Sequence, residues 1–305
     1  MPITIRPLVE IDLPVADRIL QAAFGRNQSF VEMLQLNGAA QPGNQLVAVR
    51  AGQVVGTVGA VNFGQFAYIA LMGVDPAQQG RGIARRLMEH VLARLDDHGC
   101  PIVLLDATDV GAVLYEKLGF ADDSSAYEFE GDNSLASNVA STLGSQRGPD
   151  SIRAKDSSLS TATRNLGVAR MTDADLVEVI EFDLPRFGAD RGQVLQILLN
   201  EFPERAFVCR DVTGQVTGYL FARTVLGPWV AANAATAEDL LAVARTLPSP
   251  EPLRVLVPRS NHAACDLLAR NGLHSIRKLR HMRRGGTVPP GRPECLFGQV
   301  SFGLG

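Results

Sequence analysis

The stretch Val74-Asp75-Pro76-Ala77-Gln78-Gln79-Gly80-Arg81-Gly82-Ile83-Ala84-Arg85-Arg86-Leu87 decides the fold of the first half of the chain. An apolar strand ends at Val74, Pro76 forces a turn, and a glycine-rich loop leads directly into a helix. The first turn of that helix has amide N–H groups without intrahelical partners, and the positive end of the helix dipole lies there. Because Gly80 and Gly82 let the backbone approach a ligand closely, the stretch predicts a binding site for a diphosphate.

The spacing within the loop separates it from two other phosphate-binding patterns. Arg85 stands where the third glycine of Gly-x-Gly-x-x-Gly belongs, and the Lys-Ser/Thr ending of a P-loop is missing. Residues 79–84 instead match Gln/Arg-x-x-Gly-x-Gly/Ala. In this the segment resembles the Gcn5-related N-acetyltransferase (GNAT) family, whose members bind the pyrophosphate of coenzyme A with that pattern. The resemblance implies that acetyl-CoA contacts Met72, Gly73, Val74, Gln79, Gly80, Arg81, Gly82, Ile83, Ala84 and Arg85.

Hydrophobic periodicity extends the prediction on both sides of the loop. Helices are predicted over 12–24, capped by Asp12, over 82–97 and over 110–118. Strands are predicted over 3–6, 45–50, 54–63, 66–74, 101–106 and 120–129. This order, an antiparallel meander followed by a strand-helix-strand crossover, predicts an α+β fold. The resemblance implies two tandem domains, each with a mixed, mostly antiparallel sheet flanked by helices.

Tyr115 is the first candidate catalytic residue. It lies in Leu114-Tyr115-Glu116-Lys117-Leu118-Gly119-Phe120, which resembles the helix that follows the family's fifth strand. There, a tyrosine four residues before a Gly-Phe pair commonly protonates the thiolate that leaves coenzyme A, and Tyr115 occupies that place. A phenol can supply a hydrogen bond or a proton as charge develops on sulfur. The alternative is a packed helix residue with its hydroxyl at the surface.

A base for the acceptor is harder to assign. A lysine-like amine, with a pKa of about 10.4, is mostly protonated at neutral pH, so a base or a water chain leading to one should lie near the acceptor. Many family members carry a glutamate on the fourth strand, whereas residues 66–74 contain no acid. The nearest candidate is Asp106, at the end of the fifth strand, as a base or water-orienting group. A turn or helix-capping role is the alternative.

The chain repeats its own pattern after a serine-rich segment. The pairs Asp12-Leu13 and Phe24-Gly25 recur as Asp175-Leu176 and Phe187-Gly188, each 163 residues later. The segment 131–163 has eight serines and no aromatic residue, which is typical of a linker. We therefore expect a catalytic GNAT domain over 1–130, a linker over 131–163, and a degenerate GNAT-like domain over 164–305.

The second copy lacks the parts that would carry the chemistry. The stretch from Ala231 to Ala237 has neither glycine nor arginine, and Leu268 stands where the first copy has Tyr115. This domain should therefore not bind coenzyme A in the usual way. Its expected role is structural or in binding the acceptor, and the candidate acceptor contacts are Phe24 in the first domain and Asp183, Asp190 and Trp229 in the second. The alternative is that these residues of the second domain cap helices and fill the core.

Composition narrows the class of protein. With 46% apolar and 20% charged residues, the 305-residue chain is of the soluble globular type, without a predicted membrane helix or signal peptide. A net charge of −3 argues against a nucleic-acid partner, and the basic stretch from Arg277 to Arg284 is interpreted as the solvated side of a strand pair. Four scattered cysteines predict free thiols in a cytoplasmic setting and no metal site.

These observations predict an N-acetyltransferase that moves an acetyl group from acetyl-CoA to a primary amine of a small molecule or peptide, by direct attack of the amine on the thioester. One alternative is a coenzyme A-binding sensor or interaction module without turnover, which the missing acid on the fourth strand favours. Another is a tandem enzyme like mycothiol synthase, which only the two-domain architecture supports. The sequence does not specify the acceptor or the oligomeric state.

Overall fold

The computed structural model describes residues 2–133, 167–249, 252–286, 291–301 and 303. Its contacts divide the chain into two compact units. Unit 1 consists of Met1–Ser125, Leu279–Pro290 and Phe302–Gly305, and unit 2 consists of Ala126–Lys278 and Gly291–Ser301. Unlike the expected domains 1–130 and 164–305, the units are discontinuous in sequence, because each contains segments from the other half of the chain. The expected linker, 131–163, lies outside the described residues from residue 134 onward.

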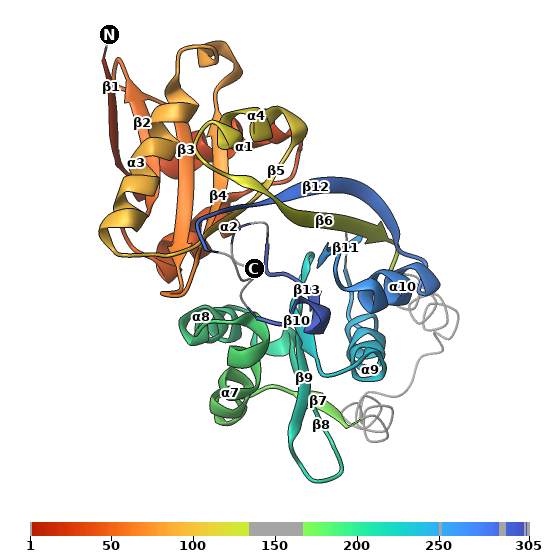
Figure 1. Ribbon diagram of the computed structural model, residues 1–305. Helices are drawn as coiled ribbons and strands as arrows, with labels where there is room; N and C mark the ends of the chain where they lie inside the picture. The colour runs from red at the N-terminus through yellow and green to blue at the C-terminus, as the bar shows by residue number, and fades with distance from the viewer. Residues whose placement is uncertain (1, 134–166, 250–251, 287–290, 302, 304–305) are drawn as a thin grey trace. The chain divides into compact units, whose positions relative to one another are not determined.

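The sheet of unit 1 combines strands from both ends of the chain. Its strand order is β1-β2-β3-β4-β5-β12. The bounds are β1 (Ile3–Pro7), β2 (Gln45–Arg50), β3 (Gln53–Asn62), β4 (Ala67–Val74), β5 (Val103–Ala107) and β12 (His274–Arg284). Strands β1 to β4 form an antiparallel meander, and β4 is parallel to β5. The C-terminal part of β12 is antiparallel to β5, and the two strands lie side by side in Figure 1.

Helices cover both faces of this sheet. On one face, α3 (Ile83–Asp97) and α4 (Asp109–Glu116) bury their apolar residues against β-strand side chains such as Val103 and Leu105. On the other face, α1 (Leu13–Phe24) and α2 (Val31–Ala40) pack together over Leu71 of β4. Since side chains alternate along a strand, Asp106 of β5 lies on the face opposite α3. The α+β fold with a mostly antiparallel sheet is confirmed, but α2 was not predicted.

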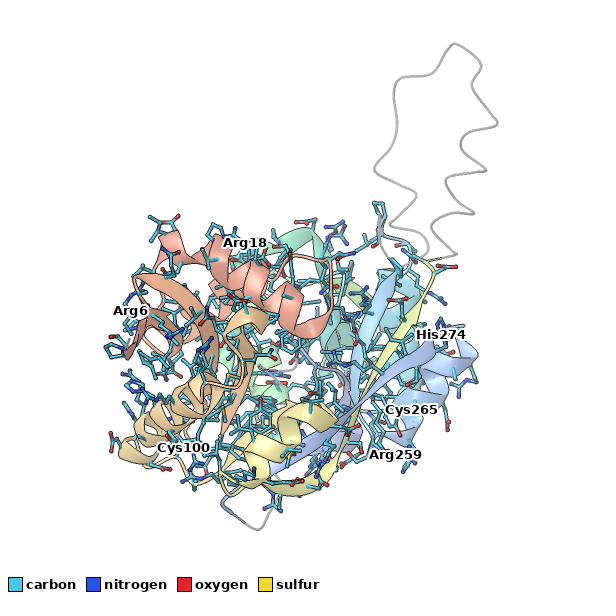
Figure 2. The ribbon with its side chains drawn as sticks, turned by 90° about the horizontal axis from the view of Figure 1, so that it is seen from above. Arg6, Arg18, Cys100, Arg259, Cys265 and His274 are labelled. Atoms are coloured by element: carbon cyan, nitrogen blue, oxygen red, sulfur yellow. The ribbon has the colours of Figure 1, made fainter. Side chains whose placement is uncertain are left out.

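Asp12 does not cap α1 through its side chain, contrary to the sequence prediction. Its carboxylate accepts a hydrogen bond from the backbone N–H of Val9 at 3.0 Å and pairs with Arg6 of β1 at 2.6 Å (Figure 2 labels Arg6). The hydrogen bond from Arg6 lowers the pKa of Asp12. Asp12 therefore links β1 to the start of α1, and its side chain does not bond the free backbone amides of that helix.

Strand β4 contains a β-bulge next to its contact with β5. Thr57 of β3 lies opposite Gly73 and Gly59 lies opposite Ala70, so Leu71 and Met72 share a single partner position. Leu71 has a φ of 52°, which costs about 1–2 kcal/mol in a non-glycine residue. The parallel pairing of β4 with β5 ends nearby, at Ile69 and Leu105. The separation of the strands beyond this pair is called the β4–β5 opening below.

The basic residues of β12 form ion pairs in unit 1. Arg280 binds Asp122 and Glu116, each at 2.7 Å. Arg283 pairs with Asp123 at 3.0 Å, and Arg284 pairs with Asp96 at 2.8 Å. Met282, which lies between these arginines, is fully buried in the core with α3. These arginines remain partly exposed on a paired strand, which agrees with the interpretation of the stretch as the solvated side of a strand pair. Their acidic partners were not predicted, because they lie far away in the sequence.

Unit 2 repeats the element order of unit 1. Its sheet has the order β13-β10-β9-β8-β7, and β6 (Ala121–Gly131) pairs with β11 through Ala126 to Gly131. The other bounds are β7 (Val168–Arg170), α7 (Leu176–Phe187), α8 (Gly192–Glu201), β8 (Ala206–Arg210), β9 (Val216–Ala222), β10 (Leu226–Ala231), α9 (Ala234–Ala244), β11 (Leu253–Pro258), α10 (His262–Arg270) and β13 (Leu296–Gly298). The α+β architecture is thus present in both units.

Strand β13 lies between β10 and β11, the strands that correspond in order to β4 and β5. It pairs antiparallel with β10, and the backbone N–H of Gln299, just beyond it, donates to the carbonyl of Leu256 in β11 at 2.8 Å. A Cβ at Gly298 would lie 2.5 Å from the carbonyl oxygen of Leu226, so only glycine fits at this position. The gap between β10 and β11 is therefore filled by the chain itself.

The helical layer of unit 2 is held by a buried charged cluster. Asp183 of α7 accepts two hydrogen bonds from Arg191, at 2.8 and 2.9 Å, and one from the Tyr219 hydroxyl at 2.6 Å. All three side chains are buried, and burial raises the pKa of Tyr219 well above its ordinary value. Because the charges of Asp183 and Arg191 are paired, their interaction offsets the free-energy cost of removing them from water.

In the part of the chain that the structure describes, no helix is both long and apolar enough to cross a membrane. The four cysteines are free thiols, as predicted. Cys100, beyond the end of α3, and Cys265, in α10, are labelled in Figure 2. Among the described residues, no group of histidine, cysteine, aspartate or glutamate side chains has the arrangement of a metal site.

Replacing Met282 by alanine should destabilise unit 1, although Met282 lies far from α3 in sequence. Removing this fully buried side chain from the α3 core should cost about 2–5 kcal/mol. Hydrogen exchange measured by mass spectrometry should show faster exchange in α3 and β5. Ile276→Ala, an exposed position earlier on β12, is the control. Faster exchange confined to residues 126–278 would contradict the assignment of Met282 to unit 1.

Replacing Asp183 by alanine should destabilise unit 2 by about 3–5 kcal/mol, because it leaves the Arg191 charge buried without its partner. Urea unfolding followed through Trp229, the only tryptophan, reports on this unit. Asp190→Ala is the matched control, since this exposed carboxylate accepts one local hydrogen bond from Gly192 and should contribute about 1 kcal/mol. Equal losses for both variants would count against the buried cluster.

Candidate active site

The predicted anion-binding loop is formed by Gln79 to Gly82 at the start of α3. A 3-10 helix over Pro76–Gln78 follows β4, and Gly80 and Gly82 both have a φ of 74°. Such left-handed conformations favour glycine, which is why both positions carry it. A Cβ at either glycine would meet no atom within 4 Å, so the loop faces open space. The expected helix start at residue 82 is confirmed, with Gly82 as the N-cap.

The backbone amides of this loop are unpaired. Arg86 N–H is the first amide of α3 with a helical partner, the carbonyl of Gly82 at 3.1 Å. In the described part of the chain, no hydrogen bond is found for the N–H groups from Gly80 to Arg85, and no side chain caps the helix. Six neighbouring donors at the positive end of a 15-residue helix are an arrangement that suits an anion.

Side chains around the loop divide into supporting and exposed groups. Gln79 donates to the carbonyl of Val74 at 3.3 Å, and Arg50 donates to Gln78 at 2.8 Å, which fixes the loop to the sheet. Arg85 pairs with Glu89 one turn further along α3 at 2.7 Å. Arg81 is exposed on the loop itself. Of the residues expected to bind the cofactor, Gln79 therefore supports the loop, and Arg81 and Arg85 are exposed cations.

The β4–β5 opening begins beyond Ile69, and β4 continues from there to Val74, just before this loop. Met72 belongs to the bulge on β4, and Gly73 and Val74 follow it. Gly73 has α1 directly over it, since a Cβ there would lie 3.1 Å from Leu20. At the near end, buried Gly303 packs on Ala70 so closely that a Cβ at Gly303 would lie 1.8 Å from the Ala70 Cβ. The expected cofactor residues of β4 thus lie between the bulge and the start of the anion-binding loop.

Tyr115 lies near the end of α4, on the α3 side of the sheet. Its ring packs against Phe120 with ring centroids 6.1 Å apart and lies over Gly111. Burial raises the pKa of Tyr115 to about 12, so the phenol stays protonated at neutral pH. Among the described residues, no hydrogen bond to the Tyr115 hydroxyl is found. A protonated phenol without a partner remains available as a donor.

Asp106 has a partner that the sequence did not indicate. Its Oδ1 lies 2.9 Å from Nδ1 of His281, which is directly opposite it in the β5–β12 pairing. Its Oδ2 is buried and has no hydrogen bond. The helix-capping alternative for Asp106 is wrong, because Thr108 caps α4 by accepting from the N–H of Gly111. His281 was not predicted as a site residue, because the basic stretch that contains it was interpreted as the solvated side of a strand pair.

The candidate acceptor residues are not brought together. Phe24 lies in the α1–α2 layer of unit 1, where its ring is 5.5 Å from that of Phe30. In unit 2, Trp229 is 0% exposed and packs on Phe297. Asp183 is buried in its ion pair, and Asp190 closes a local turn with Gly192. For the residues of unit 2, these contacts match the core-filling and helix-end roles, and Phe24 alone lies beside the bulged strand.

Unit 2 lacks the features of the unit 1 site. The amide of Thr236 in the first turn of α9 donates to the side chain of Asn233, whereas α3 has no such cap. The gap that corresponds to the β4–β5 opening holds β13. Leu268, in the position of Tyr115, is fully buried. The expectation that unit 2 does not bind coenzyme A in the usual way remains a prediction, and these contacts favour it.

Comparison with known proteins places both halves in one family. Residues 41–122 match an acetyltransferase (GNAT) domain, and residues 179–298 match a second acetyltransferase (GNAT) domain. The chain is 25% identical over 232 residues to the uncharacterized N-acetyltransferase YitH of Bacillus subtilis (strain 168), which covers 73% of this chain and 72% of YitH. The sequence likeness therefore extends over both units.

Solved structures share the fold. One described as an acetyltransferase from Pyrococcus horikoshii has a TM-score of 0.77 at 22% identity, covering 99% of this chain and 96% of that chain. A GCN5-related N-acetyltransferase from Sphaerobacter thermophilus has a TM-score of 0.64 at 16% identity, covering 95% and 96%. Since the two domain matches, the relative and the fold agree, the chain belongs to the GNAT family and is an N-acetyltransferase built from two GNAT domains.

Proposed function

We propose that unit 1 transfers the acetyl group of acetyl-CoA to a primary amine by direct attack of the amine on the thioester. The observation that carries this proposal is the row of unpaired amides from Gly80 to Arg85 at the start of α3. A diphosphate is an anion that such a row suits, because several neighbouring donors are available to its oxygens without any being used elsewhere. Arg81 adds a positive charge beside it.

In this proposal the rest of acetyl-CoA extends from the loop along β4. The pantetheine arm would bind the backbone of Met72 to Val74, and the thioester would lie in the β4–β5 opening next to the bulge. The amine nitrogen forms a bond to the acetyl carbon, the carbon–sulfur bond breaks, and the sulfur leaves with its electron pair. The amine loses one proton and the thiolate gains one, which gives the amide and free coenzyme A.

Tyr115 would serve the leaving sulfur as a hydrogen-bond donor. A phenol with a pKa of about 12 is a weaker acid than a thiol, whose pKa is about 8.5. Complete proton transfer from Tyr115 to the thiolate is therefore uphill, and stabilisation of the developing charge by a hydrogen bond is the favoured role. The final proton would then come from solvent.

A second candidate function is a coenzyme A-binding sensor without turnover. The absence of an acid from residues 66–74 favours it, because the family's common base is missing from this strand. Isothermal titration with acetyl-CoA, followed by assay of thiol release over a panel of primary amines, separates the two functions. Binding without turnover on any amine would support the sensor.

Gly82→Asp should abolish acetyl-CoA binding, with a loss of affinity of at least about 100-fold. A carboxylate at this N-cap would accept the amides that the diphosphate needs and would repel the phosphates. Isothermal titration measures the effect. Gly82→Ala isolates the strain of the left-handed backbone, and Gly52→Asp places the same charge on a hairpin glycine with a φ of 77°. Unchanged affinity in Gly82→Asp would remove the cofactor site.

Tyr115→Phe should lower kcat by about 10- to 100-fold while the Kd for acetyl-CoA changes little. Loss of a hydrogen bond to a charged sulfur is worth about 1.5–3 kcal/mol, and it acts only as the charge develops. Steady-state rates and titration are compared in the same buffer. Tyr127→Phe, in unit 2, serves as the control for loss of a phenol. Wild-type kcat in Tyr115→Phe would show that Tyr115 has only a packing role.

A further inference from the structure

The pair Asp106–His281 is a buried titratable group that the proposed function does not yet use. Asp106 is the first residue of β5 beyond its last parallel pair with β4, so it lies where the β4–β5 opening begins. His281 comes from β12 and lies opposite Asp106 across the β5–β12 ladder, within unit 1. Its ring centroid is 6.1 Å from that of Tyr68 on β4. The imidazole therefore reaches across β5 toward β4.

The two members of the pair differ in access. The Asp106 side chain is 0% exposed, whereas that of His281 is 15% exposed. Asp106 binds Nδ1 of the imidazole, and among the described residues no hydrogen bond to Nε2 is found. Part of the imidazole is therefore accessible from solvent, whereas the carboxylate is not. The accessible member of the pair is therefore His281, whereas the sequence suggested Asp106 itself as the base.

We propose that His281 is the general base of the acetyl transfer and that Asp106 is its positioning residue. The inference rests on the proposed function, since it assigns the group that takes the proton from the attacking amine. It also assigns to the second half of the chain a direct part in the chemistry of unit 1, because β12 supplies the base.

The hydrogen bond to Asp106 selects the required tautomer. With Nδ1–H donating to the carboxylate, Nε2 carries the lone pair that accepts a proton. As the amine nitrogen bonds to the acetyl carbon, it becomes positively charged and acidic. Nε2 takes one proton from that nitrogen, the sulfur leaves with the electron pair of the carbon–sulfur bond, and the imidazolium later returns its proton to solvent or to the thiolate. The sum is amine plus acetyl-CoA to amide plus coenzyme A.

The charges around His281 suit this role near neutral pH. Burial disfavours the imidazolium, but the charge and hydrogen bond of Asp106 outweigh it, and the net result is a pKa raised above 6.5. Asp123 raises the pKa further, and Arg283 opposes it. The phenol of Tyr68 is the facing group from β4. A base is active when neutral, so kcat should rise with pH through the raised pKa of His281 and then level off.

The first test replaces His281 by glutamine, which keeps a hydrogen-bonding side chain but removes the base. The probes are glycinamide, Nα-acetyl-lysine and spermidine, and the amine that the wild type acetylates fastest is used. We expect kcat at pH 7 to fall by about 100-fold or more, with the KM for acetyl-CoA changed less than about threefold. The acidic limb of kcat against pH should disappear. His274→Gln, at the exposed start of β12, is the matched control and should keep both.

The second test uses Asp106→Asn, which leaves the base in place and alters its environment. Loss of the carboxylate removes the interaction that raises the pKa of His281, so the acidic limb of kcat should move to lower pH. NMR titration of the His281 ring should show the same downward shift without any turnover. A purely structural role for Asp106 would lower the stability but would leave the limb where it is in the wild type. Should His281→Gln fail to fold, this shift still decides the proposal.

The outcomes separate this inference from the proposed function. If the wild type acetylates an amine and His281→Gln retains its kcat and its acidic limb, His281 is not the base and the acetyl transfer stands. If Asp106→Asn leaves both the limb and the NMR titration unchanged, the positioning role is overturned. If the wild type binds acetyl-CoA but acetylates none of the three amines, the proposed function and this inference are overturned together.

Discussion

The pairing of β5 with β12 is the interaction on which unit 1 depends. Strand β5 is bonded to β4 over only three residue pairs, so without β12 its other edge would be unpaired in the sheet. Helix α3 packs on β5 through Val103 and Leu105, and the anion-binding loop is the start of that helix. Ion pairs of Arg280, Arg283 and Arg284 hold β12 in register. The loop near residue 80 therefore depends on residues near 280.

The two units show how one architecture can keep or lose a ligand site through local hydrogen bonding. In unit 1 the first turn of α3 is uncapped and the β4–β5 opening follows a strained bulge at Leu71. In unit 2 the side chain of Asn233 caps α9, and β13 fills the gap between β10 and β11. At these two places unit 2 thus satisfies its backbone groups internally, while unit 1 leaves the donors at the start of α3 unpaired. The difference supports the proposal that unit 1, and not unit 2, binds acetyl-CoA.

The sequence predicted the features that depend on neighbouring residues. The start of α3, the strands of the meander and the helix that carries Tyr115 all follow from local periodicity and glycine placement. Helix α2 was not predicted because its own apolar residues are distributed around the helix, so its sequence shows no distinct polar face. The contribution of β12 to unit 1 and of β6 to unit 2 was not predicted, because strand pairing between residues so far apart in the sequence leaves no local signal. For the same reason the partner of Asp106, 175 residues away, was not predicted.

Two buried aspartates illustrate how hydrogen bonding distinguishes a structural role from a chemical one. Both oxygens of Asp183 are satisfied by Arg191 and Tyr219, so the group is fully paired and its burial needs no other explanation. Asp106 is as deeply buried, but only Oδ1 has a partner, and that partner is a titratable imidazole. An unsatisfied buried carboxylate oxygen costs free energy that packing alone would not maintain. Groups with such a cost are commonly found at functional sites. The unpaired Oδ2 of Asp106 therefore supports a role for the Asp106–His281 pair beyond holding two strands together.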